Sequence, residues 1–164
     1  MAFIQIDRNM FFDKEVVDKI GAEGLTLYCL LLTRRGLNPF TDFTIKSIIA
    51  YTNRKSDTVL KYSDKDRNVS RLKGLPIIRK YLKVLSDNGY IKVKNSVDLD
   101  TVGLNDIIML TIEQNLEQGF IQVDIRLFIN YINRIGHNGW LIFYILHSLH
   151  NETYGEGGYA NPTL

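Results

Sequence analysis

The apolar positions between residues 25 and 32 recur at the spacing of an α-helix, and Gly36 ends that pattern. A second helix is predicted over 45–52, because Thr44 is a favourable N-cap and Ile48 and Ile49 would face inward. The order of these two segments indicates a small helical core in the first half of the chain.

The most regular pattern lies between Pro76 and Gly89. Ile78, Leu82 and Leu85 stand at i, i+4 and i+7, which predicts a helix with one buried stripe. Pro76 suits the first turn and Gly89 suits the residue after the C-cap. Residues 90–94 then alternate as a strand, and 107–112 supplies its partner across a loop. Three helices and a hairpin follow the winged helix-turn-helix plan, so we predict a mainly α-helical α+β fold.

Two segments of the chain are repeated. Residues 3–7, Phe-Ile-Gln-Ile-Asp, return as Phe-Ile-Gln-Val-Asp at 120–124, and the Ile-Gly-x-x-Gly segment at 20–24 returns at 135–139. We therefore expect a winged-helix domain over 1–116 and the start of a second, truncated copy over 117–164. On this interpretation the chain is the N-terminal piece of a longer protein; the alternative is a second copy that has decayed into a helical appendage.

The charge is unevenly distributed along the chain. The 45% apolar content excludes a disordered protein, and the net charge is only +2. Residues 54–94, however, hold twelve Lys/Arg against four Asp/Glu, whereas residues 95–164 hold two against eight. This separation of basic and acidic segments favours a partner that is itself highly charged, and double-stranded DNA is the first candidate.

The buried stripe of the third helix places basic residues on its opposite side, which would enter a DNA groove. Lysines of the first wing strand would meet phosphates, and the N-terminus of the second helix would face the DNA backbone. The predicted DNA-binding residues are Thr44, Lys46, Ser47, Arg67, Arg71, Lys73, Arg79, Lys80, Lys83, Lys92 and Lys94.

The position of the recognition helix has two interpretations. We favour 74–87, which makes 54–73 a basic insertion in the turn. The alternative places the recognition helix at 56–65. The insertion would be either an arm that orders on DNA or a loop without a role.

The pattern resembles the N-terminal winged-helix domains of replication initiators and replisome organisers from phages and plasmids of low-GC bacteria, and DnaD-type primosome proteins are similar. The resemblance rests on Phe11-Phe12, Ala22, Leu25-x-x-Tyr28-x-x-Leu31 and Leu82-x-x-Leu85-x-x-x-Gly89-Tyr-Ile91. It implies DNA binding at an origin or at an operator. A transcription regulator of the same fold is the alternative.

The sequence carries no recognisable catalytic or cofactor-binding motif. The single Cys29 allows no internal disulfide, and His147 with His150 lacks enough further ligands for zinc. The sequence has no phosphate-binding glycine motif, signal peptide or transmembrane run. We predict a cytoplasmic non-enzyme without a cofactor or metal.

The C-terminal third is acidic and rich in aromatic residues, so it would not bind DNA. Trp140, Phe143 and Tyr144 have helical spacing, which is more typical of a core than of an interface. If the second copy is truncated, this region lacks its cover, and we expect a homodimer through the C-terminal helical region. A protein-interaction module is therefore the second functional hypothesis.

Overall fold

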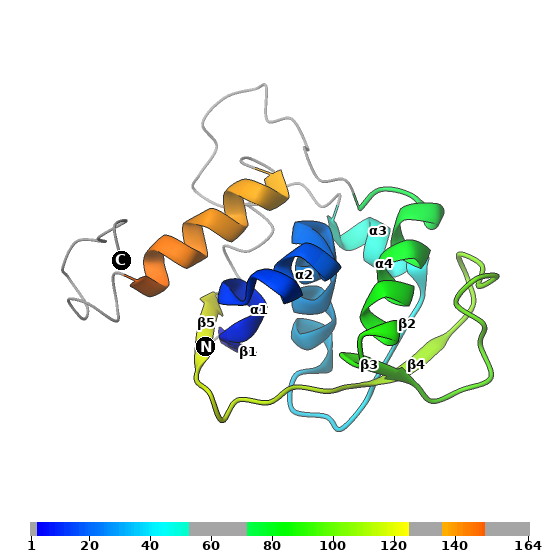
Figure 1. Cartoon of the computed structure of the whole chain (residues 1–164). Helices are drawn as coiled ribbons and strands as arrows, with labels where there is room; N and C mark the ends of the chain where they lie inside the picture. Colours follow the sequence, from blue (N-terminus) through cyan, green and yellow to red (C-terminus); the bar gives the residue numbers. More distant parts are fainter. Residues whose placement is uncertain (1–2, 53–71, 125–135, 150–164) are drawn as a thin grey trace.

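A computed structural model describes residues 3–52, 72–124 and 136–149, and Figure 1 shows how they are arranged. The chain has a mixed α+β fold in which helices dominate and the strands form two small antiparallel sheets. In chain order the elements are β1 (Phe3–Asp7), α1 (Asn9–Phe12), α2 (Lys14–Arg35), β2 (Thr41–Phe43), α3 (Ile45–Thr52), α4 (Leu75–Asp87), β3 (Ile91–Val93), β4 (Ile108–Ile112) and β5 (Phe120–Asp124), followed by a helix over 136–149, here called the C-terminal helix.

Helix α2 forms the centre of the molecule. Asp13 caps its first turn, where the side chain accepts a hydrogen bond from the Glu15 amide at 3.0 Å. Gly21 interrupts the helix with φ 69°, a conformation that a residue with a Cβ adopts only with strain. Beyond this kink nearly every residue is buried up to Leu32, and the helix ends at Gly36. The predicted apolar helix is confirmed, and it begins earlier than the pattern indicated.

The sheet that follows α2 contains three strands in the order β2-β4-β3. The predicted hairpin is confirmed as β3 and β4, in which Lys92 pairs with Thr111. Strand β2 was not predicted, because its three residues, Thr41–Phe43, are too few to show a pattern. It pairs with the edge of β4 that faces away from β3, and it lies between α2 and α3 in the chain.

The two copies of the repeated strand sequence lie side by side. Strand β1 pairs antiparallel with β5, and the register is symmetric about Gln5 and Gln122. Both strands have the same alternation of exposed and buried residues, so both direct their second and fourth residues into the core. The first residues of the predicted second copy therefore complete a sheet with the first residues of the chain.

The C-terminal helix covers α1 and the first part of α2 on the side away from α4 (Figure 1). Trp140 is fully buried, and its ring centroid lies 5.9 Å from that of Phe11. His137 Nδ1 and Thr26 Oγ1 lie 2.8 Å apart in the buried interior. Trp140 and Tyr144 are core residues, as expected, whereas Phe143 stays 39% exposed. None of the helices in the described ranges combines the length and apolar character that crossing a bilayer requires.

Candidate nucleic-acid interface

Helix α4 has the predicted buried stripe. Ile78, Leu82 and Leu85 are all fully buried, and the helix packs against α2. Gly24 allows this approach, because a Cβ there would lie 3.3 Å from the Tyr81 ring. Pro76 lies in the first turn and Gly89 follows the C-cap with φ 80°, both as predicted.

The basic residues of α4 do not all face solvent, which corrects the prediction for Arg79. Its side chain is half-buried, with Nε donating to the Val102 carbonyl at 2.7 Å and Nη2 donating to the Thr101 carbonyl at 3.2 Å. Arg79 lies beside the apolar stripe, where its long stem is covered while the guanidinium reaches the loop between β3 and β4. Arg79 thus anchors that loop, and its contact with DNA stays a prediction.

Lys83 is exposed but paired. Its Nζ lies 2.7 Å and 2.8 Å from the two carboxylate oxygens of Asp100. The hydrogen bond to Asp100, and then the negative charge of that carboxylate, raise the pKa of Lys83 above its ordinary value. Lys80, in contrast, points outward with its Nζ 5.3 Å from the centre of the Tyr81 ring.

The N-terminus of α3 is stabilised by hydrogen bonds within the protein. Thr44 is the predicted N-cap, since its hydroxyl accepts from the Ser47 amide at 3.1 Å. The Lys46 amide donates to the Leu104 carbonyl at 3.0 Å. These amides therefore have partners within the protein, whereas contact of this end of α3 with the DNA backbone stays a prediction. The Lys46 side chain is exposed.

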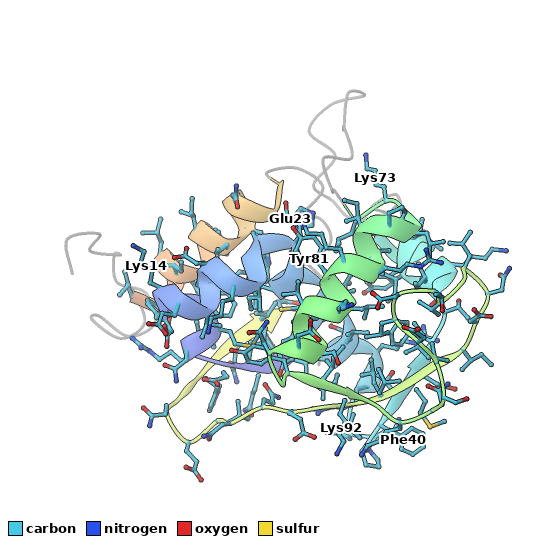
Figure 2. The ribbon with its side chains drawn as sticks, turned by 45° about the vertical axis from the view of Figure 1, so that its right-hand side comes forward. Lys14, Glu23, Phe40, Lys73, Tyr81 and Lys92 are labelled. Carbon is cyan, nitrogen blue, oxygen red and sulfur yellow. The ribbon has the colours of Figure 1, made fainter. Side chains whose placement is uncertain are left out.

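The lysines outside the helices are exposed. Lys92 and Lys94 alternate with the less exposed Ile91 and Val93, as predicted for one face of the strand. Lys73 is also exposed, just before α4. Figure 2 shows Lys73 at one end of α4 and Lys92 near Phe40 on the sheet, at the other end of the view. The basic side chains thus extend along the length of α4 and onto the hairpin.

Arg67 and Arg71, most of the predicted insertion 54–73 and the alternative recognition helix at 56–65 lie outside the described residues. The favoured segment 74–87 is helical from Leu75 to Asp87. Of the two histidines in question for zinc, His147 lies on the C-terminal helix, where its ring stacks on that of Phe143 with 6.0 Å between the ring centroids. His150 lies outside the described residues. No cluster of metal ligands occurs among residues 3–52, 72–124 and 136–149.

The loop between β3 and β4 was not predicted to be part of this surface. Val102 is only 2% exposed, so the loop is packed onto the helices. Asp98 accepts from the Asp100 amide at 2.9 Å, and Asp106 accepts from the Gly103 amide at 2.7 Å. The available signal was the composition of residues 95–107, which include three aspartates and no basic residue.

A separate cavity of about 330 Å³ lies at the other end of β3 and β4, lined in part by Asp7, Tyr28, Tyr90 and Gln114. The Tyr28 hydroxyl donates to the Glu113 carbonyl at 2.9 Å, and burial raises the pKa of this phenol far above its ordinary value. The lining brings acidic and phenolic groups together without a basic residue, so it is unsuited to phosphate.

Comparison of the chain with protein-family models, with curated proteins and with solved structures finds no match.

Proposed function

We propose that this protein binds double-stranded DNA through a winged helix-turn-helix formed by α2, β2, α3, α4, β3 and β4. The observation that carries the proposal is the combination of that chain order with the strand order β2-β4-β3 and with exposed lysines along α4 and the hairpin. In this arrangement α4 is the recognition helix and β3–β4 the wing. Lys80 faces the groove, while Lys92 and Lys94 contact flanking phosphates.

A role in replication initiation is the form of this function that we favour, and it rests on the sequence resemblance described above. Regulation of transcription would use the same surface. Selection of bound fragments from sheared genomic DNA of the source distinguishes the two roles, because repeated sites beside an AT-rich tract indicate an origin, whereas a single palindrome indicates an operator.

Fluorescence anisotropy with a labelled AT-rich duplex tests the proposal. On α3, α4 and the hairpin, four lysines of the described structure are exposed without a side-chain ion pair, namely Lys46, Lys80, Lys92 and Lys94. If these and one or two paired or neighbouring residues contact phosphates, log K falls against log salt with a slope of about −4.5 to −5.5, at about −0.9 per contact.

Charge-removing variants localise the contact. Lys80→Gln should weaken binding and make the salt slope less steep by about 0.9. Lys14→Gln is the matched control, because Lys14 is an exposed lysine on α2, well separated from α4 in Figure 2. Equal effects of both variants, or no binding at low salt, contradict the proposal.

A second candidate function, self-association, is favoured by the C-terminal helix. Ile142 is 56% and Leu146 38% exposed on this helix. We infer that the helix repeats α2, because Gly136 has φ 77° where the matching Gly21 has φ 69°. The residues that match Ile142 and Leu146 are Leu27 and Leu31, and both are fully buried in α2.

The proposed homodimer places these open faces of two C-terminal helices against each other. Analytical ultracentrifugation tests this: wild-type protein should sediment as a dimer, and Ile142→Glu should sediment as a folded monomer. A monomeric wild type at micromolar concentration contradicts it.

A further inference from the structure

The loop over residues 94–107 is held against α3 and α4, two of the three helices of the proposed DNA-binding unit. The Leu104 carbonyl accepts from the Lys46 amide at the start of α3, and the Val102 carbonyl accepts from Arg79 on α4. Val102 itself is buried. Figure 1 shows this connection between β3 and β4 extending beside α4. The wing is therefore fixed at a defined place next to the recognition helix.

This attachment determines where Asp100 lies. Its amide is bonded to Asp98, its neighbour Thr101 is bonded to Arg79, and its carboxylate contacts Lys83 with both oxygens. The two side chains are 48% (Lys83) and 60% (Asp100) exposed, so an incoming ligand can reach the pair. A carboxylate with two oxygens on one ammonium group occupies the position that two phosphate oxygens would take.

Given the proposed DNA-binding function, on which this inference rests, we propose that Asp100 is a determinant of DNA affinity that competes with a backbone phosphate for Lys83. Binding replaces the Asp100–Lys83 pair by a phosphate–Lys83 pair and leaves the Asp100 charge beside the DNA. Asp100 thereby weakens the part of the affinity that is the same for every duplex sequence. Contacts to base edges then account for a larger share of the total affinity, so they determine the choice of site more strongly.

Asp100→Asn tests this proposal because it removes the charge and retains the backbone amide that Asp98 caps. Asp87→Asn is the matched control: Asp87 is exposed at the end of α4, four residues after Lys83, but makes no ion pair with it in the described structure. Anisotropy titrations of the full chain on one duplex, at several salt concentrations, give Kd and the salt slope for each variant.

The expected result is an affinity about eightfold higher for Asp100→Asn at 0.1 M salt, with a slope steeper by about 0.9, as for one additional phosphate contact. Asp87→Asn should gain about twofold or less, because its charge is screened by solvent. In a Lys83→Gln background the gain from Asp100→Asn should disappear, since the competition acts through Lys83.

The outcomes separate the two proposals. If wild type binds DNA and Asp100→Asn gains no more than Asp87→Asn, competition by Asp100 is refuted while the DNA-binding function stands. A gain that persists in the Lys83→Gln background also refutes it, because the effect is then one of general charge. If no variant binds at low salt although circular dichroism shows each to be folded, the DNA-binding function itself is refuted.

Discussion

The anchoring of the β3–β4 loop by Arg79 makes Arg79→Ala an informative perturbation. The bond from Nε to the Val102 carbonyl is 2.7 Å long and its acceptor belongs to a buried residue, whereas the second bond, to Thr101, is longer and exposed. A hydrogen bond from a charged donor contributes about 1.5–3 kcal/mol, and the exposed bond adds little. The variant should therefore lose about 2 kcal/mol of the free energy of unfolding.

Urea unfolding followed by far-UV circular dichroism measures this loss. Lys80→Ala is the control, because Lys80 is the next residue on the same helix and its contact with the Tyr81 ring is worth at most about 1 kcal/mol. Hydrogen exchange adds a local test: the Val102 amide, which donates to the Asp98 carbonyl, should exchange faster in Arg79→Ala and at the wild-type rate in Lys80→Ala.

The anchoring role is refuted if the two variants lose the same stability, or if the Val102 amide keeps its protection in Arg79→Ala. The same reasoning shows why an Arg79 variant is a poor probe of DNA contact. Reduced DNA binding would combine the lost charge with a displaced β3–β4 loop, so Lys80 is the residue that tests the helix face.

Three further predictions follow from the conformation of one glycine and the burial of two side chains. Gly21→Ala should cost about 1–3 kcal/mol, because the combination of φ 69° with ψ 169° is open essentially only to glycine, and thermal unfolding should show a lower Tm. Folding raises the pKa of Tyr28, so the contribution of this neutral phenol to the free energy of unfolding is complete below about pH 10 and is lost as the pH rises above that value. When unfolding is measured from pH 9 to 12, the free energy of unfolding should therefore fall less steeply with pH in Tyr28→Phe than in the wild type. Val123→Asp buries a charge at a position with 0% exposure and should lower the free energy of unfolding by more than about 4 kcal/mol. Gln122→Asp, on the exposed face of the same strand, should lower it little. The fluorescence of Trp140 measures the unfolded fraction of each variant.

The helices whose positions depend on short-range sequence patterns were predicted correctly. The stripe of Ile78, Leu82 and Leu85 placed α4 and its buried side, and Thr44 marked the start of α3. The role of Arg79 could not be predicted, because a residue beside a stripe turns inward or outward according to a loop more than twenty residues away. The Lys46–Leu104 bond depends on the same distant loop.

The repeat illustrates a similar limit of sequence analysis. The matching strands were identified, but nothing in either segment indicated that the two would pair with each other. Which strands pair depends on how segments distant in the chain bury their apolar faces in one core. Residues 3–7 and 120–124 come together only in the folded protein.

The symmetric register of β1 and β5 has a consequence for how molecules meet. Because the two strands carry nearly the same side chains and pair about Gln5 and Gln122, each strand fits the position of the other. A β1 strand from one molecule can therefore bond to a β1 or a β5 strand of a neighbour through the contacts that close a single molecule. The strand pair is thus self-complementary, which is the property that exchange of a strand between two chains requires.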